Sequence, residues 1–161
     1  MRVFAIDPGP GKSAFVVYDS EQHEIIDKGI LGNQLIRGEL FSNTDEVVIE
    51  MIASYGMPVG KEVFETCVWI GRFMECALEG SESVSRITRN EVKNEICHSS
   101  KAKDSNIRQA LIDMFPKTGL DGKNNPSGIG TKKHQGPLYG VSADMWAALA
   151  VAIAWSNTTT R

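Results

Sequence analysis

The chain has few cysteines, no long apolar run and no large excess of charge of either sign. Cys67, Cys76 and Cys97 are odd in number and lack C-x-x-C spacing, which argues against a disulfide framework and a zinc site. No segment approaches the roughly 20 apolar residues of a membrane span. Asp7 stands where a signal peptide would be apolar. We therefore expect a soluble cytoplasmic protein with no membrane partner.

The length and composition indicate one globular domain. With 161 residues and 42% hydrophobic content, the chain can bury a proper core, whereas two domains would be cramped. We expect a single domain over residues 1–161.

The net charge of −3 is unevenly distributed along the chain. Residues 86–133 contain ten Lys or Arg against five Asp or Glu, whereas the rest contains seven against fifteen. Such asymmetry is typical of a protein with one phosphate-facing surface and separate acidic metal ligands, although chance unevenness on a solvated surface is the simpler alternative.

Asp7 ends a short apolar run and directly precedes Pro8-Gly9-Pro10-Gly11. Residues 3–6 suit a strand buried on both faces, and the prolines stop strand pairing because they lack an amide donor. The β-branched and aromatic run that follows predicts a hairpin partner rather than a helix. Residues 9–14 therefore only imitate a dinucleotide fingerprint, which needs a following helix, and a P-loop fails on glycine spacing. We expect no organic cofactor.

The remaining pattern predicts alternating strands and helices in an α/β arrangement. A third strand is expected over 24–31, a loop over 32–44 and a buried strand over 46–52. An amphipathic helix over 61–80 and a strand over 84–88 follow, then helices over 91–97 and 106–115 with Asp104 or Ser105 as the N-cap of the second. Residues 117–140 read as a long mobile loop, and Ser142 is predicted to cap a buried apolar helix over 143–155.

Three acids interrupt apolar surroundings at the ends of these elements: Asp7, Glu50 and Asp144. A buried carboxylate is costly unless something compensates it, and a shared divalent cation does so. Each acid also has a purely structural explanation. Asp7 suits a turn, Glu50 suits an ion pair across the sheet, and Asp144 suits the positive end of a helix dipole. The hypothesis of a metal site rests on the three together.

The order of elements and four motifs resemble the RuvC-type Holliday junction resolvases of the ribonuclease H-like superfamily, in particular a compact phage-type branch. The motifs are Phe4-Ala-Ile-Asp-Pro-Gly, Val47-Val-Ile-Glu, Trp69-Ile-Gly-Arg-Phe and Asp144-Met-Trp-Ala-Ala-Leu-Ala-Val-Ala. The resemblance implies a mixed five-stranded sheet in the order 3-2-1-4-5, with the first three strands antiparallel and helices on both faces.

The resemblance also implies a reaction. Asp7 would bridge two Mg²⁺ or Mn²⁺ ions while Glu50 and Asp144 each complete one side, as two-metal hydrolysis of a phosphodiester requires. The expected function is resolution of Holliday junctions or other branched DNA by paired nicks that leave 5′-phosphate and 3′-hydroxyl ends. Family members often carry a further carboxylate where this chain has Ala147, so three acids suffice or His134, Asp121 or a water completes the set.

The basic segment supplies the candidate DNA contacts. Lys101 and Lys103 precede a predicted helix, Lys132 and Lys133 lie in the long loop, and Arg89 is a weaker candidate, each against the alternative of a solvated charge. Tyr55 stands where the family places a residue that wedges into the junction. Two symmetric cuts call for a homodimer, for which the helix from Lys61 is the candidate interface, with exposed Phe64, Trp69 or Phe73 as its sign.

Three other functions fit parts of the pattern. An RNA-processing or flap nuclease would share the fold, and a catalytically silent branched-DNA-binding module would explain Ala147. An actin-like or sugar-kinase ATPase also begins with a strand, an aspartate and a glycine hairpin, but it needs two such domains and further nucleotide motifs, which 161 residues cannot hold.

Overall fold

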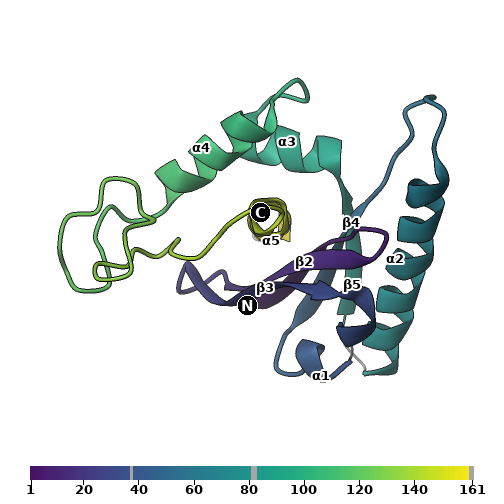
Figure 1. Ribbon diagram of the computed structural model, residues 1–161, viewed down its shortest axis with the longest axis horizontal. Coiled ribbons are helices and arrows are strands. Elements are labelled where there is room, and N and C mark those ends of the chain that lie inside the picture. The colour runs from purple at the N-terminus through teal and green to yellow at the C-terminus, as the bar shows by residue number, and fades with distance from the viewer. Residues whose placement is uncertain (37, 81–82, 160–161) are drawn as a thin grey trace.

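The computed structural model describes residues 1–36, 38–80 and 83–159, which form a mixed five-stranded sheet with helices on both faces (Figure 1). The strands lie in the order β3-β2-β1-β4-β5. Strand β2 is antiparallel to β1 and to β3, whereas β4 runs parallel to β1 and to β5. The strand bounds are β1 (Arg2–Asp7), β2 (Lys12–Asp19), β3 (Glu24–Gly32), β4 (Glu46–Met51) and β5 (Ser83–Thr88). The predicted order and directions are confirmed.

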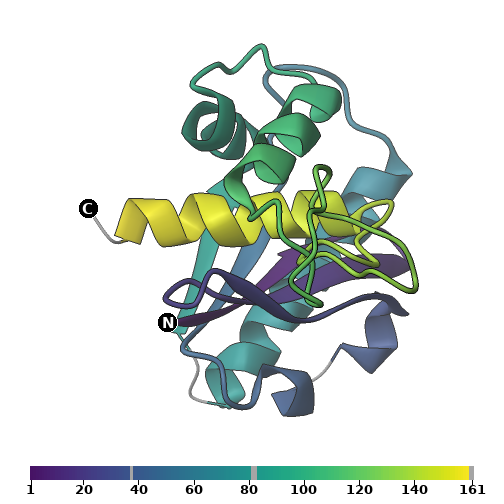
Figure 2. The same ribbon diagram turned by 90° about the vertical axis from the view of Figure 1, so that its left-hand side faces the viewer.

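Five α-helices cover the sheet within the described residues: α1 (Gly38–Phe41), α2 (Lys61–Glu79), α3 (Arg89–Cys97), α4 (Asp104–Met114) and α5 (Met145–Thr159). Helix α5 crosses one face of the sheet with α3 and α4 packed beyond it, while α2 and α1 lie on the other face (Figure 2). The loop expected over 32–44 is wrong in part, because a 3₁₀ turn (Asn33–Leu35) and α1 form there and bury Ile36 and Phe41.

Alternation along the strands divides the core into two halves. In β1, Val3 and Ala5 point into the half that contains α5, whereas Phe4 and Ile6 point into the half that contains α2. A strand with apolar residues on both faces must lie inside the sheet, where helices shield both sides from water. Strand β1 is therefore central, and its last residue, Asp7, lies at the end of the sheet where the strand terminates, midway between the two outer strands.

Helix α5 is apolar on nearly every side because the sheet and α3 enclose it. The helix begins at Met145, two residues later than predicted, and runs on to Thr159. The delay follows from the backbone of Ala143, whose φ of 46° lies in the left-handed region. A non-glycine residue in that region is strained and cannot start a helix.

Helix α2 is enclosed on one side only. Its inner side buries Ile70, Phe73 and Ala77, whereas Phe64 and Val68 are 63% and 60% exposed. The helix covers 61–79 almost as predicted. Of the predicted interface aromatics, Phe64 is exposed and Trp69 is partly buried, but the expectation for Phe73 is wrong, since it fills the core beneath the helix.

Helices α3 and α4 begin earlier than predicted. Thr88 caps α3 by accepting a hydrogen bond from the backbone N–H of Glu91, whose carboxylate accepts from Thr88 in return. This capping box starts the helix at Arg89. In α4 the N-cap is Lys103, whose backbone N–H donates to Asn106, rather than Asp104 or Ser105. Both helices therefore present their first side chains over the sheet edge.

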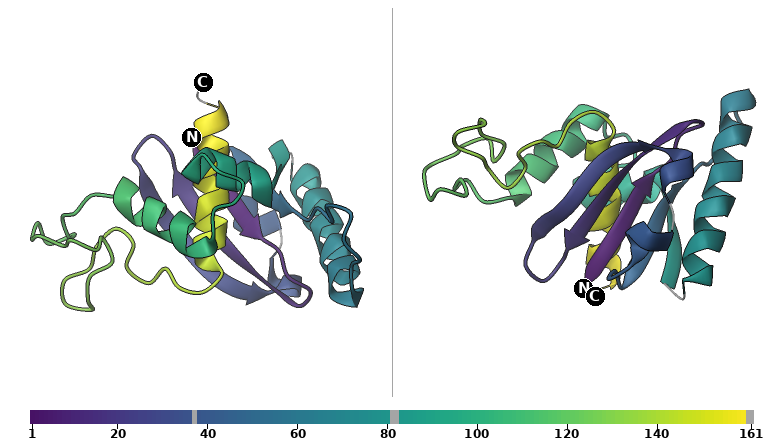
Figure 3. Two further views of the ribbon diagram at one scale, coloured as in Figure 1. Left: turned by 90° about the horizontal axis from the view of Figure 1, so that it is seen from above. Right: turned by 60° about the horizontal axis from the view of Figure 1, so that its bottom comes forward.

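The segment between α4 and α5, residues 117–140, extends away from the sheet on the side opposite α2 (Figures 1 and 3). We call it the lobe. Two isolated bridges, Thr118 with Asn124 and Gly130 with Gln135, fold it back on itself. Gly136 packs so closely that an added Cβ would lie 2.1 Å from the Gly128 carbonyl oxygen. The predicted loop is thus internally bonded.

No helix in the described part of the chain has the length and apolarity needed to cross a bilayer.

Candidate active site

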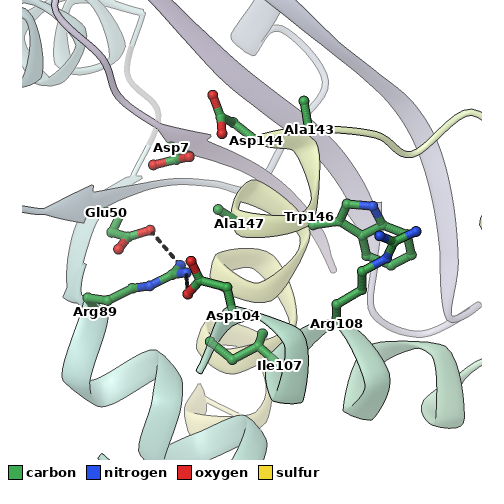
Figure 4. Close-up of a pocket in the computed structure, with 10 residues that line it drawn as sticks. All are labelled: Asp7, Glu50, Arg89, Asp104, Ile107, Arg108, Ala143, Asp144, Trp146 and Ala147. Atoms are coloured by element: carbon green, nitrogen blue, oxygen red, sulfur yellow. Dashed lines mark hydrogen bonds and ion pairs between the residues drawn. The ribbon is translucent and has the colours of Figure 1, made fainter. Parts of the chain in front are cut away.

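A cavity of about 350 Å³ opens at the sheet edge where β1 and β4 end (Figure 4). Asp7, Glu50 and Asp144, which are far apart in the sequence, all line it. The full lining is Asp7, Glu50, Arg89, Asp104, Ile107, Arg108, Ala143, Asp144, Trp146 and Ala147. We call this cavity the acid pocket. The structure brings together the three acids that the sequence singled out.

The parallel pairing of β1 and β4 places Asp7 beside Glu50. The register pairs Ile6 with Ile49, so that the next residue of each strand is an acid. Both acids lie on the side of the sheet that faces α5, because they continue the alternation of Ala5 and Val48. The Glu50 side chain is only 12% exposed. Neighbouring parallel strands thus present two carboxylates at one edge.

Asp144 enters the pocket from the start of α5. Its carbonyl oxygen accepts the backbone N–H groups of Ala147 and Ala148, so it stands directly before the helix rather than in its first turn as predicted. The side chain is exposed, and the preceding residue, Ala143, has the left-handed backbone. Strained backbone is concentrated at functional sites, and here it turns the chain from the lobe into the helix.

The tight turn after Asp7 is locked by a buried asparagine. Asn33 donates from Nδ2 to the Gly9 carbonyl at 2.8 Å and accepts from Ser13 Oγ at 2.7 Å. Ser13 Oγ also accepts the Gly9 N–H, and a Cβ at Gly9 would lie 2.4 Å from the Lys12 carbonyl oxygen. Only glycine fits there. This network orients the end of β1, and Asn33 could not be identified from the sequence because it lies in the 3₁₀ turn after β3, far from Asp7 along the chain.

The pocket is lined by four acids and two arginines. Burial, followed by repulsion from Glu50 and Asp144, raises the pKa of Asp7 from 3.8 to about 7. Burial also raises the pKa of Glu50, against the opposing attraction of Arg89. Carboxyl groups held in a site that disfavours their ionised form gain most from a cation.

Arg89 is tied to two of the acids by its guanidinium. It donates to Asp104 Oδ1 at 2.6 Å and reaches Glu50 Oε2 at 3.5 Å (Figure 4). Arg89 is the first residue of α3, so the capping box described above fixes where it emerges. It lines the pocket, but its charge is already engaged by protein carboxylates.

Asp104 is a fourth acid of the pocket that sequence analysis considered only as a helix cap. It is the first residue of α4, and its side chain is 82% exposed. Ala147 also lines the pocket, so the expected gap in the acid set is real. The two residues proposed to fill it, Asp121 and His134, instead pair with each other at 2.6 Å beside a second cavity in the lobe. In the sequence, Asp104 stood out only as an acidic residue between Lys103 and Arg108.

The donor set fits a hard divalent cation, since carboxylate oxygens are the ligands that Mg²⁺ and Mn²⁺ prefer. The acids share one cavity without closing on a common point: among the described residues, no three His, Cys, Asp or Glu side chains form a compact ligand group. Repulsion between like charges favours such spacing.

Of the candidate DNA contacts, Arg89 lines the acid pocket, whereas the four lysines and Tyr55 do not. Lys101 and Lys103 are exposed just before α4, and Lys132 and Lys133 are exposed in the lobe. Tyr55 is 61% exposed with a φ of 48°. It lines a smaller cavity of about 190 Å³ that shares Asp7, Glu50 and Arg89 with the acid pocket. Tyr55 therefore shares a cavity with two of the three acids, Asp7 and Glu50.

No protein-family model matches the chain, and no curated protein matches it in sequence. Solved structures do match. A RuvC structure from Thermus thermophilus is 14% identical with a TM-score of 0.70, covering 99% of this chain and 98% of that one. Thermus thermophilus RuvC in complex with a Holliday junction substrate is 13% identical with a TM-score of 0.65, covering 99% and 95%. The chain therefore has the fold of these RuvC structures.

Proposed function

We propose that the protein is a divalent-metal-dependent endonuclease that resolves Holliday junctions or other branched DNA. The observation that carries the proposal is the meeting of Asp7, Glu50 and Asp144 in one cavity at the edge of a RuvC-type sheet. A structural neighbour bound to a Holliday junction substrate supports branched DNA as the ligand. We take residues 1–161 as one nuclease domain.

Asp7, Glu50 and Asp144 are the residues that would hold two Mg²⁺ ions, with Mn²⁺ as a substitute. When bound, the ions supply activation of the water nucleophile and neutralisation of the charge that develops on the phosphate. Asp7 is central because its burial and its neighbours make the ionised carboxylate costly without a cation. Hydrolysis would leave a 5′-phosphate and a 3′-hydroxyl, which can be religated.

Arg89 acts on the reaction through Glu50 in this proposal. Its ion pairs with Glu50 and Asp104 restrict the conformations of the Glu50 side chain. A partly buried carboxylate held in one orientation is better placed to bind an ion than a mobile one. Lys101, Lys103, Lys132 and Lys133 would neutralise phosphates of the arms, and Tyr55 would stack on a base at the branch point.

The active unit is proposed to be a homodimer that pairs through α2. Phe64 and Val68 on the outer side of α2 are exposed apolar residues spaced one turn apart, and Leu78 continues the surface near the end of the helix. A second copy of this chain is the occupant that suits a two-fold junction, because paired nicks need two active sites related by the same symmetry. We call Phe64, Val68 and Leu78 the α2 surface.

A catalytically silent branched-DNA-binding module is the second candidate. The spacing of the acids and the presence of Ala147 favour it. It shares the fold and the basic surface but would cut no DNA in any divalent metal.

Cleavage of a labelled mobile four-way junction distinguishes these functions. The wild type and Asp7→Asn are incubated with junction, flap, duplex and RNA substrates in Mg²⁺ and in Mn²⁺. We expect paired nicks in the junction with the wild type only. Preferred cleavage of flaps or RNA would indicate the alternative nucleases of the same fold. Binding of junctions without cleavage in either metal would show the silent module instead.

A further inference from the structure

Arg108 lies at the acid pocket on the side opposite Arg89 (Figure 4). It follows Asp104 by one turn of α4 and is exposed. Its guanidinium carbon lies 4.8 Å from the centre of the Trp146 ring. Trp146 is the second residue of α5 and is only 9% exposed, so this arginine rests on a fixed surface.

The two arginines of the pocket differ in what holds them. Arg89 is bound by two carboxylates, which already satisfy its charge. Arg108 makes no ion pair with any acid in the described part of the chain, and its guanidinium stacks on the indole face of Trp146. An arginine stacked on an aromatic ring keeps its five N–H donors at the edge of its plane, where a ligand can reach them. Arg108 is therefore the cation of the pocket that remains available.

Small side chains line the pocket together with Arg108 and the acids. Ala143 and Ala147 each contribute only a methyl group to it. A polyanion that approaches four carboxylates is repelled unless a cation meets it. Guanidinium groups bind phosphate through two parallel hydrogen bonds, with a defined orientation.

We propose that Arg108, oriented by Trp146, binds a backbone phosphate of the DNA strand that enters the acid pocket. Arg108 then fixes the strand beside Asp144, while Arg89 positions Glu50 and does not contact DNA. This inference rests on the proposed endonuclease function, since it names the group that holds the substrate at the same site. Arg108 belongs to the basic segment 86–133 but was not among the individual DNA contacts predicted from the sequence, because its stack on Trp146 joins α4 to α5 only in the folded chain.

Binding measurements test the phosphate contact without cleavage. Asp7→Asn and the double variant Asp7→Asn with Arg108→Ala are titrated with a four-way junction by fluorescence anisotropy at several salt concentrations. We expect about tenfold weaker binding and a salt slope reduced by about one when Arg108 is removed. The control Asp7→Asn with Arg86→Ala removes an exposed arginine of β5 outside the acid pocket and should bind as Asp7→Asn does.

Cleavage measurements test the positioning. In Mg²⁺, Arg108→Ala should lower the single-turnover rate by about 30-fold, a loss of one charge-assisted contact in the transition state. Arg108→Lys should restore the salt slope but not the rate, since lysine keeps the charge without the paired donors. Circular dichroism and thermal melts confirm that each variant is folded.

The outcomes separate the two proposals. Equal affinity, salt slope and rate for Arg108→Ala and Arg86→Ala would overturn the role of Arg108 even if junctions are cut. A wild type that cuts no DNA, with junction binding that still depends on Arg108, would overturn the endonuclease and retain the phosphate contact.

Discussion

The two faces of the sheet are covered by helices with opposite surroundings. Helix α5 is surrounded by the sheet and α3, and its side chains are buried over most of its length. Helix α2 buries one side and leaves the α2 surface exposed. A fully packed helix holds the residue at its start rigidly, whereas an apolar surface in water favours association. We infer that the α5 face serves the chemistry and the α2 face serves assembly.

The largest expected effect comes from a substitution that alters only the α5 face. Asp7→Asn removes the central carboxylate of the acid pocket and should lower junction cleavage by about 10³-fold, comparable to the loss of a preorganised charge at a transition state. Junction binding should remain because the proposed DNA contacts are unchanged, and the oligomeric state should remain because the α2 surface is untouched. The matched control is Asp27→Asn on β3, an exposed aspartate outside the pocket. Full cleavage by Asp7→Asn would remove the acid pocket from the reaction.

The second largest effect comes from a substitution that alters only the α2 face. Phe64→Glu places a charge in the proposed interface and should weaken the dimer about 30-fold, as loss of a central anchor does. Analytical ultracentrifugation measures the association, and a junction assay measures whether two nicks occur together. We expect single nicks in place of paired ones. Ile26→Glu, at an exposed apolar residue of β3, is the control and should leave the association unchanged. Dimers of undiminished affinity in Phe64→Glu would place the interface elsewhere.

The third effect concerns how much the ionised Asp7 carboxylate on the α5 face lowers the free energy of unfolding. Because burial and neighbouring acids raise the pKa of Asp7 from 3.8 to about 7, the folded protein loses stability as the pH rises from about 4 to 7. Above pH 7 the penalty is complete. Asp7→Asn should therefore be more stable than the wild type at pH 8 in metal-free buffer by about 2 kcal/mol, roughly half the full linkage value.

Urea denaturation at pH 4 and pH 8 measures this difference. The gain of Asp7→Asn should disappear at pH 4, where the wild-type carboxyl is largely protonated in the folded state. Asp27→Asn should show no comparable gain at pH 8. A destabilised Asp7→Asn at pH 8 would mean that the ionised carboxylate is compensated within the protein.

The smallest effect concerns the lobe, which belongs to neither face. Replacing Lys132 and Lys133 with alanine should weaken junction binding only a few-fold at moderate salt and reduce the salt slope by about two. The cleavage rate at saturation should be unchanged, since neither lysine lines the acid pocket. Arg2→Ala, at the opposite end of β1 from Asp7, is the control for loss of an exposed charge. An unchanged salt slope in the double variant would show that the lobe does not contact DNA.

Local patterns in the sequence predicted the strands and singled out the acids Asp7, Glu50 and Asp144, whereas the sheet order was implied by the resemblance to RuvC-type resolvases. Strands that are apolar on both faces are central, and an acid at the end of such a strand lies at the sheet edge whatever the remaining fold. The register that places Asp7 beside Glu50 follows from two parallel neighbours of this kind. Their role as metal ligands stays a prediction.

Tertiary structure alone decided the rest of the pocket. Asp104, Arg108 and Trp146 meet because α4 packs across the start of α5, and Asn33 locks the turn after Asp7 from the 3₁₀ turn that follows β3. Phe73 is core rather than interface for the same reason. Periodicity within one element tells which side of a helix is apolar, but it carries no information on which distant element covers that side. That choice depends on the packing of whole helices, and it distinguished the engaged Arg89 from the available Arg108.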